Sequence, residues 1–204
     1  MSQVVLWDVD TQVDFVLPDG KLYVPGAEQT LPAMARLVAA ARPAGIPHVA
    51  SADDHELTDE EISDEPDFRD TWPPHCLRGT RGARKVLETE QQDPVPIGLT
   101  PLPGRFLRGR EFLLHKKHVD VFTNPNTDAL LDFLAPAELI VFGVATDVCD
   151  DLAIRGFLAR DLRVRFVEDA ARGLDEERVA AATAAWRQAG VGFATAGEVI
   201  GTLR

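Results

Sequence analysis

Hydrophobic residues along this chain form short continuous runs that alternate with longer stretches in which apolar residues recur at helical spacing. The short runs predict strands at residues 4–9, 46–50, 111–114, 139–142, 162–167 and 191–194. The longer stretches predict helices at residues 27–42, 126–134, 150–160, 175–189 and from 197 onward. Because strands and helices alternate, we expect parallel β-α-β units and a three-layer α/β fold with a doubly wound, mainly parallel, Rossmann-like sheet.

The length and composition are those of an ordinary globular protein. With 204 residues, the chain is long enough to bury a core without disulfides, and we expect residues 1–204 to form a single domain. Hydrophobic residues make up 45% of the chain and charged residues 26%, which argues against a disordered or fibrous protein. Its two cysteines are too few for a disulfide framework and are compatible with a reducing compartment.

The charge and the N-terminal sequence limit the partners that we expect. A net charge of -12 without any basic stripe argues against binding to the phosphates of nucleic acids. The N-terminal residues enter a strand pattern without the basic segment of a signal peptide, and no apolar run approaches the length of a membrane span. We therefore expect a cytoplasmic protein that binds neither nucleic acids nor membranes.

Residues suited to catalysis or metal binding follow the predicted strands. These residues are Asp10, Asp53, His55, Lys116 and Cys149. In a doubly wound sheet, ligands bind beyond the carboxyl ends of the strands. We therefore expect these side chains to meet in one crevice, which is the predicted functional site.

Cys149 lies where a predicted strand meets a predicted helix. At such a position, unpaired N–H groups and the helix dipole lower the pKa of a thiol and can bind an oxyanion. By its position alone, a lone cysteine is more often a small buried hydrophobic residue. Asp10 and Lys116 favour the catalytic interpretation, because a carboxylate can accept the thiol proton and an ammonium group stabilises both the carboxylate and the thiolate.

Separate stretches of the chain carry a resemblance to a known family. They are D-T-Q-V-D-F at residues 10–15, Lys116 followed by Phe122, G-V-A-T-D-V-C at residues 143–149, and D-D-H at residues 53–55 with W-P-P-H-C-L-R-G-T at residues 72–80. Together they resemble the motifs of the isochorismatase-like cysteine hydrolases over roughly the whole chain. The last pair is similar to that of the nicotinamidases within this family, and relatives with other substrates often lack it.

The resemblance implies an enzyme that cleaves the C–N bond of a linear carboxamide. In the family mechanism, Asp10 deprotonates Cys149, the thiolate attacks the carboxamide carbon, ammonia leaves and water hydrolyses the thioester, while Lys116 stabilises the charged pair. Backbone N–H groups of Ala145 and Cys149 would form the oxyanion hole, next to a cis peptide bond between Val144 and Ala145. The implied reaction converts nicotinamide to nicotinate, a step of pyridine nucleotide salvage.

The resemblance also implies a metal ion and an aromatic pocket. Asp53, His55 and His75 would bind one divalent ion, with zinc as the first candidate and manganese or iron as alternatives, because an aspartate and two histidines suit these ions. The ion would hold the pyridine nitrogen of nicotinamide, and Phe15 and Trp72 would enclose its ring. Homo-oligomers are common in this family, so we also expect one here.

The sequence departs from the family pattern at the metal site. Asp54 stands where the family more often has an aromatic residue, and the acidic stretch at residues 56–70 lacks the histidine that some nicotinamidases use as a further ligand. Water or an acid such as Glu61 would then complete the ligand shell. We expect the acidic stretch to be a solvated loop or a short helix near the mouth of the crevice.

Alternative functions fit parts of the sequence. One is an amidase of the same family for another small amide or carbamoyl substrate. Another is a haloacid-dehalogenase-type phosphatase, because residues 8–11 resemble its D-x-D-x-T motif with Asp8 as the nucleophile, but this interpretation leaves Cys149 and the turn at residues 72–80 unexplained. A receiver-like signalling domain also gathers acids and a lysine at strand ends, but receivers are much shorter and need no cysteine.

For the remaining candidate residues we expect structural roles. His48, His115 and His118 are expected at the surface or at strand ends rather than as metal ligands, and Cys76 is expected to be structural. Asp14 would either support the site or cap a turn.

Overall fold

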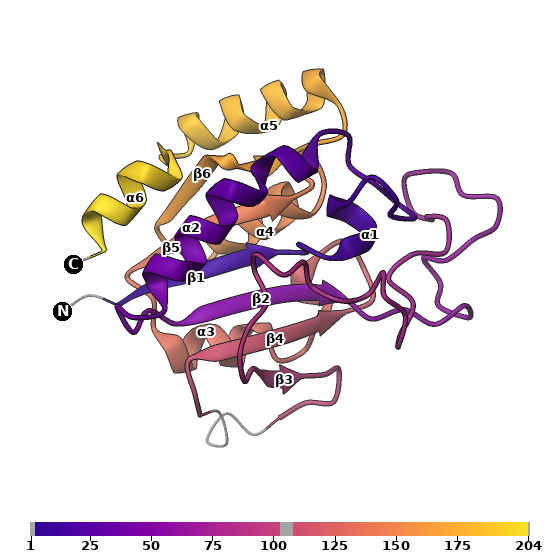
Figure 1. Ribbon diagram of the computed structural model, residues 1–204, viewed down its shortest axis with the longest axis horizontal. Coiled ribbons are helices and arrows are strands. Elements are labelled where there is room, and N and C mark those ends of the chain that lie inside the picture. Colours follow the sequence, from indigo (N-terminus) through magenta and orange to yellow (C-terminus); the bar gives the residue numbers. More distant parts are fainter. Residues whose placement is uncertain (1–2, 103–107, 204) are drawn as a thin grey trace.

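The computed structural model describes residues 3–102 and 108–203, and within them a sheet of parallel strands runs through the centre of the molecule (Figure 1). Its strands lie in the order β3-β4-β2-β1-β5-β6-β7, and each neighbouring pair is parallel. The strands are β1 (Val4–Val9), β2 (His48–Asp53), β3 (Val95–Ile97), β4 (Glu111–Lys116), β5 (Glu138–Val144), β6 (Val164–Arg172) and β7 (Gly192–Ala194). The predicted parallel sheet is confirmed.

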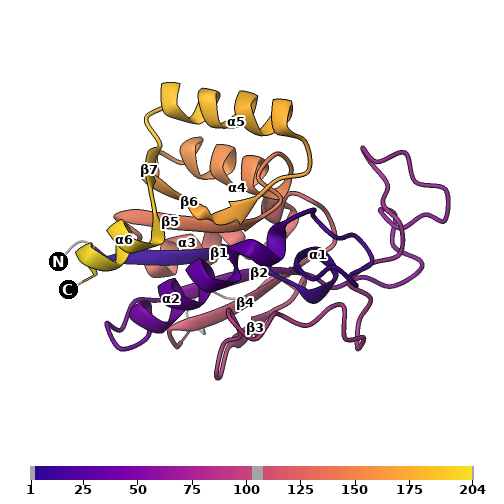
Figure 2. The ribbon, with the colours of Figure 1, turned by 45° about the horizontal axis from the view of Figure 1, so that its top comes forward.

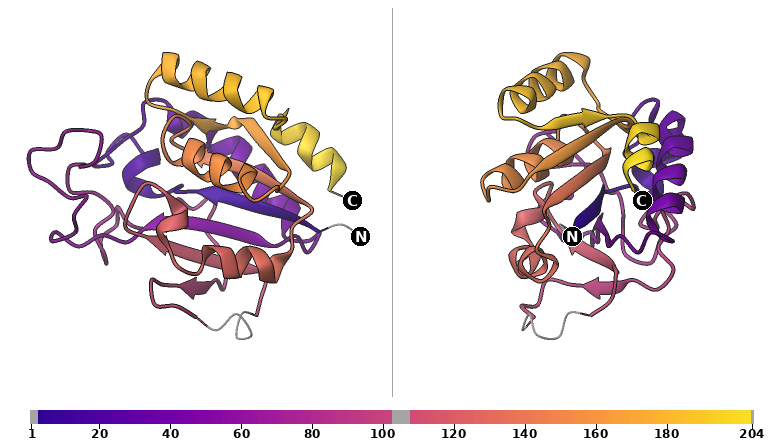
Figure 3. Two further views of the ribbon diagram at one scale, coloured as in Figure 1. Left: turned by 180° about the vertical axis from the view of Figure 1, so that it is seen from behind. Right: turned by 90° about the vertical axis from the view of Figure 1, so that its left-hand side faces the viewer.

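Helices cover both faces of the sheet. The α-helices are α1 (Val13–Val16), α2 (Leu31–Ala41), α3 (Thr127–Leu134), α4 (Cys149–Leu158), α5 (Glu176–Gln188) and α6 (Ala196–Thr202), and the short 3₁₀ helices η1 (Ala27–Thr30) and η3 (Val121–Thr123) precede α2 and α3. Helices α2 and α6 pack on one face, and α3, α4 and α5 pack on the other (Figures 2 and 3). This arrangement confirms the three-layer α/β fold. In the described part of the chain, no helix combines the length and hydrophobicity that a membrane span needs.

The central strand β1 is buried on both of its faces. Val5 and Trp7 point into the core beneath α3, α4 and α5, whereas Leu6 points into the core beneath α2 and α6. The ring of Trp7 packs edge-on against Phe157 of α4, with 4.7 Å between the ring centroids. A parallel strand that is buried on both faces has a continuous apolar run rather than an alternating pattern. Such continuous apolar runs are the reason that the sequence predicted β1 and β5.

The strand order reverses at β1, where the chain first adds β2 on one side and later β5 on the other. At such a reversal, the connections that leave adjacent strands diverge and open a crevice beyond the carboxyl ends of the strands. The segments that surround this edge are α1, the long connection of residues 54–94 and the turn of residues 145–148 before α4. In Figure 1, the long connection projects beyond the strand ends.

Some elements differ from their predicted bounds. Asp53 and Lys116 are the last residues of β2 and β4 rather than residues that follow these strands, because the two are register partners and pairing extends the strands past their apolar runs. Residues 91–104 are rich in proline and glycine, a composition that favours an irregular connection or an edge hairpin, but they contain the parallel edge strand β3. Residues 103 and 104 of this stretch lie outside the described part of the chain. Helix α1 was not predicted, because its 4 residues are too few to show helical periodicity.

Candidate active site

Lys116 lies between two carboxylates at the carboxyl edge of the sheet. Asp10 directly follows β1, and Asp53 and Lys116 end β2 and β4, so parallel pairing brings all three to one edge. The Nζ atom of Lys116 lies 2.9 Å from Oδ2 of Asp10 and 2.5 Å from Oδ1 of Asp53. All three side chains are buried. The site therefore holds one cation between two acids and shields all of them from water.

The surroundings of the two carboxylates shift their pKa values in opposite directions, upward for Asp10 and downward for Asp53. Burial raises the pKa of Asp10, Lys116 only partly offsets this effect, and the charge of Asp53 adds to it, so the net shift is upward. Burial also acts to raise the pKa of Asp53, but the charge of Lys116 and the nearby rings of His55 and His75 lower it well below its usual value. Asp53 is therefore the stable anion of the pair, and Asp10 is the more basic acid, suited to accept a proton.

Cys149 is the first residue of α4, its side chain is buried, and the charges of Lys116, Asp10 and Asp53 act on it. Burial raises the pKa of its thiol well above the usual value, Lys116 lowers it, and the charges of Asp10 and Asp53 raise it again. The resting thiol is therefore protonated, and a base must remove its proton before the sulfur can attack a substrate. Oδ2 of Asp10 has no hydrogen-bond partner among the described residues, because its contact with Lys116 lacks hydrogen-bond geometry. That oxygen can accept a proton, although it is ion-paired with Lys116.

The sequence did not predict two residues that position the acids. The hydroxyl group of Ser51 donates a hydrogen bond to Oδ1 of Asp10 at 2.7 Å. The side-chain amide of Gln12 accepts from the backbone N–H of Asp53 at 2.7 Å and donates to the carbonyl oxygen of Asp53 at 2.8 Å. Ser51 precedes Asp53 by two residues, and the period of two in a strand places both on one face. That spacing was the available signal for Ser51, and Gln12 lies inside the D-T-Q-V-D-F motif.

The side chains of Asp53, His55 and His75 form a candidate metal site, in which the ligand atoms all lie within 4.8 Å of one another. Nδ1 of His55 lies 3.2 Å from a carboxylate oxygen of Asp59, and Nδ1 of His75 donates to the carbonyl oxygen of Pro73 at 2.8 Å. Each ring is thus oriented by one nitrogen and presents Nε2 to the cluster. Nε2 of His55 is buried and has no hydrogen-bond partner among the described residues. This donor set fits a divalent ion such as zinc.

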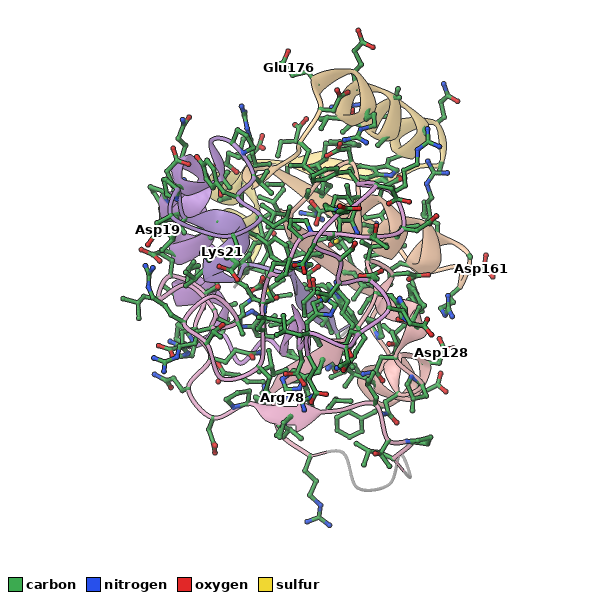
Figure 4. All side chains as sticks on the ribbon, turned by 90° about the vertical axis from the view of Figure 1, so that its right-hand side faces the viewer. Asp19, Lys21, Arg78, Asp128, Asp161 and Glu176 are labelled. Carbon is green, nitrogen blue, oxygen red and sulfur yellow. The ribbon has the colours of Figure 1, made fainter. Side chains whose placement is uncertain are left out.

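Asp54 and Glu61, two acids near the candidate metal site, make other contacts. Asp54 pairs with the guanidinium group of Arg78, with 2.6 Å between Oδ2 and Nη2. Arg78 is labelled in Figure 4. Glu61 accepts a hydrogen bond from the backbone N–H of Val119 at 3.0 Å. Within the described residues, the candidate metal site includes neither acid.

A cavity lies over the thiol. Its walls include Phe15 and Trp72, the aromatic residues predicted for a substrate pocket, together with Cys149, His75 and Ala145. Its volume is about 30 Å³, which is room for about two water molecules. A flat aromatic ligand must therefore extend into the mouth of the cavity or displace its walls.

The turn before α4 carries the predicted oxyanion donors. The peptide bond between Val144 and Ala145 is cis, as the family resemblance implied. The carbonyl oxygen of Ala145 accepts hydrogen bonds from the N–H groups of Val148 and Asp150. In contrast, the backbone hydrogen bonds of the described residues include none donated by the N–H of Ala145 or Cys149. These two N–H groups are available to a developing oxyanion.

Asp8 is not placed to act as a nucleophile. It is fully buried, accepts a hydrogen bond from the hydroxyl group of Thr11 at 2.8 Å, and lies 2.8 Å from Nζ of Lys85 and 3.4 Å from Nε2 of His48. The phosphatase alternative needs Asp8 to attack a substrate. These contacts occupy its carboxylate, and Asp8 is not among the described residues that line the cavity, which argues against that alternative. His48 is the first residue of β2, in line with the expected strand-end position.

Comparisons with known proteins agree with this arrangement. The profile of the isochorismatase domain matches residues 4–198. Nicotinamidase/pyrazinamidase of Mycobacterium tuberculosis is 30% identical over 189 residues, which cover 90% of this chain and 94% of that protein. The structure of pyrazinamidase of Pyrococcus horikoshii in complex with zinc superposes with a TM-score of 0.76 and 22% identity, covering 95% of this chain and 99% of that one. An isochorismatase family protein from Desulfovibrio vulgaris gives a TM-score of 0.78 and 24% identity, covering 100% and 99%. At these identities, the structural matches show a shared fold.

Proposed function

The chain belongs to the isochorismatase family of hydrolases, and we propose that it is a metal-assisted cysteine amidohydrolase that converts nicotinamide and water to nicotinate and ammonia. The relative from Mycobacterium tuberculosis is named nicotinamidase/pyrazinamidase, and the similarity extends over 90% of this chain. The observation that carries the proposal is the meeting of a thiol, an acid and a lysine beside a cluster of metal-binding side chains.

The first step is the transfer of a proton from the thiol. Oδ2 of Asp10 accepts the proton from Sγ of Cys149, and the thiolate attacks the carboxamide carbon. Burial acts to lower the pKa of Lys116, but the charges of Asp10 and Asp53 raise it well above its usual value, so the lysine stays charged. This fixed positive charge stabilises the thiolate as it forms.

The remaining steps use the same groups in turn. The N–H groups of Ala145 and Cys149 bind the oxyanion of the tetrahedral intermediate. As the C–N bond breaks, Asp10 returns its proton to the leaving nitrogen, and ammonia departs. A water molecule then loses a proton to Asp10 and attacks the thioester carbon, and the carboxylic acid leaves as the thiol forms again. The sum of the steps is one amide and one water converted to one acid and one ammonia.

Asp53, His55 and His75 would hold the metal ion. When bound, the ion supplies an electron-pair acceptor for a ring nitrogen of the substrate. Phe15, whose ring centroid lies 5.2 Å from that of His75, and Trp72 would enclose the substrate ring. A pyridine or pyrazine carboxamide has both an amide and a ring nitrogen, so it suits this combination of groups better than an aliphatic amide does.

Ammonia release by the zinc-loaded protein tests this function. The panel contains nicotinamide, pyrazinamide, benzamide, which lacks a ring nitrogen, and a small carbamoyl compound, with the Cys149→Ala variant as the control. We expect release from nicotinamide and pyrazinamide, much less from benzamide and none with the variant. Release from the carbamoyl compound alone would indicate the alternative amidase instead.

A further inference from the structure

An exposed aromatic residue near the cavity has a backbone conformation that bulky residues rarely adopt. Phe68 has a φ of 58° and is 57% exposed. It belongs to the acidic stretch at residues 56–70, here called the acidic loop, which projects beyond the strand ends (Figures 1 and 2). A left-handed conformation is unfavourable for such a side chain and persists only where the surroundings hold it. The contacts of Phe68 therefore show what holds its backbone in this conformation and which residue its ring contacts as a result.

A network of hydrogen bonds holds the tip of the acidic loop. Oδ1 of Asp67 accepts hydrogen bonds at 2.9 Å from the backbone N–H groups of residues 69, 70 and 71. These bonds lower the pKa of Asp67, so its carboxylate remains charged. The N–H of Phe68 donates to the carbonyl oxygen of Thr71 at 3.1 Å. The turn thus fixes the backbone of Phe68 without using its side chain.

The ring of Phe68 contacts a wall of the cavity. It packs edge-to-face against Trp72, with 6.2 Å between the centroids and 84° between the ring planes. Trp72 lines the cavity beside Cys149, and its backbone is fixed by hydrogen bonds with Glu61 and Ser63. Its indole Nε1 has no hydrogen-bond partner among the described residues. The orientation of the indole therefore depends on packing, to which Phe68 contributes an aromatic contact.

We propose that Phe68 is a positioning residue that holds the indole of Trp72 as a wall of the cavity and so favours flat aromatic amides over aliphatic ones. This role rests on the proposed amidohydrolase function. The cavity volume of about 30 Å³ leaves much of an aromatic ring in the mouth, so the orientation of the wall there affects how well the ring packs. Because Phe68 acts through Trp72, its loss weakens binding of the ring without changing attack on the amide carbon.

Calorimetry of nicotinamide binding to the zinc-loaded Cys149→Ala protein tests this role. Adding Phe68→Ala is expected to weaken binding about two- to tenfold. Adding Phe68→Asn is expected to have the same effect, because asparagine tolerates the left-handed backbone but lacks the ring. Phe68→Tyr should retain the affinity. Leu57→Ala, which removes another exposed apolar side chain of the acidic loop, is the matched control and should also retain it.

Kinetics and fluorescence separate a positioning role from a general effect on the fold. In the active protein, Phe68→Asn is expected to raise KM for nicotinamide at unchanged kcat, and the affinity for isobutyramide, an aliphatic amide, should not change. Trp7 and Trp186 are buried in the core, so a red shift of tryptophan emission in Phe68→Asn without ligand reports on Trp72. Unchanged emission with unchanged nicotinamide affinity would overturn the role of Phe68 and leave the proposed function intact. Nicotinamide binding to none of the variants, Leu57→Ala included, would overturn the proposed function and the substrate preference with it.

Discussion

Lys116 donates a hydrogen bond to Asp53 at 2.5 Å, so the lysine of the candidate catalytic group is bonded directly to an aspartate of the candidate metal site. The other carboxylate oxygen of Asp53 faces His55 and His75. The charge of Lys116 therefore acts on both sites, because it keeps Asp53 ionised for a metal ion and stabilises the thiolate of Cys149 as it forms. The two sites are electrostatically coupled through one side chain.

Lys116→Met should strongly destabilise the protein, because it leaves two buried carboxylates without their cation. We expect the free energy of unfolding at neutral pH to fall by about 3–5 kcal/mol, as measured by urea denaturation. Lys117→Met is the control, since Lys117 is partly exposed and pairs with the partly exposed Asp59, and it should cost about 1 kcal/mol or less. Equal losses in the two variants would contradict the coupling.

Cys149→Ala should abolish ammonia release while the fold persists. Loss of a covalent nucleophile lowers kcat by about 10⁴-fold or more, and removal of one sulfur from a cavity wall leaves the rest of the site in place. Turnover is measured as ammonia released, and folding is measured by circular dichroism and thermal unfolding. Near-normal turnover would refute the assignment of Cys149 as the nucleophile.

His75→Ala should lower the metal content of the purified protein and weaken nicotinamide binding. It removes one of the three donors of the candidate metal site, whose geometry depends on all three. Elemental analysis after dialysis against zinc measures the bound metal. His115→Ala is the control, because His115 lies in β4 outside the candidate metal site, so this variant should retain the metal. A wild-type protein that binds no metal would remove the metal site from the proposal.

Asp150→Asn should stabilise the protein more strongly as the pH rises. Asp150 is fully buried beside Cys149, and neither carboxylate oxygen has a hydrogen-bond partner among the described residues. Burial raises its pKa well above the usual value, and the charge of Asp10 adds to this shift. Above its ordinary pKa, the folded state therefore binds a proton that the unfolded state has released, so stability falls as the pH rises toward the folded pKa.

The asparagine variant has no such proton, so its gain in unfolding free energy over the wild type should be larger at about pH 7 than at about pH 4. Urea denaturation at the two pH values measures this difference. Asp161→Asn, at an exposed position labelled in Figure 4, should show no comparable pH-dependent gain. A gain of the same size at both pH values would mean that Asp150 is not held as a neutral acid.

The pattern of apolar residues was sufficient to predict the parallel sheet and the edge at which the site lies. Buried parallel strands have continuous apolar runs, and helices between them require that their carboxyl ends meet at one edge. Asp10, Lys116 and Cys149 each follow such a run in the sequence. Their convergence was therefore predictable without knowing any distance between them.

The pairing of individual acids was not predictable in this way. Asp8 lies near the end of the apolar run of β1, and Asp10 directly follows it. Lys85 lies 2.8 Å from Asp8, and no local pattern predicts the position of the connection to which Lys85 belongs. Both acids are fully buried, but Asp8 is held by Lys85, whereas Oδ2 of Asp10 is ion-paired with Lys116 and has no hydrogen-bond partner among the described residues.

Neighbouring residues at the end of β2 show the same limit. Pairing with β4 extends β2 to Asp53, whose side chain contacts Lys116, whereas Asp54 pairs with Arg78. By itself, the sequence determined every strand of the described sheet except the edge strand β3, and which strand ends carry reactive groups, because a buried strand is set by the local apolar pattern. Only the tertiary structure decided which acids are neutralised and which remain available, because that depends on charges brought together from distant parts of the chain.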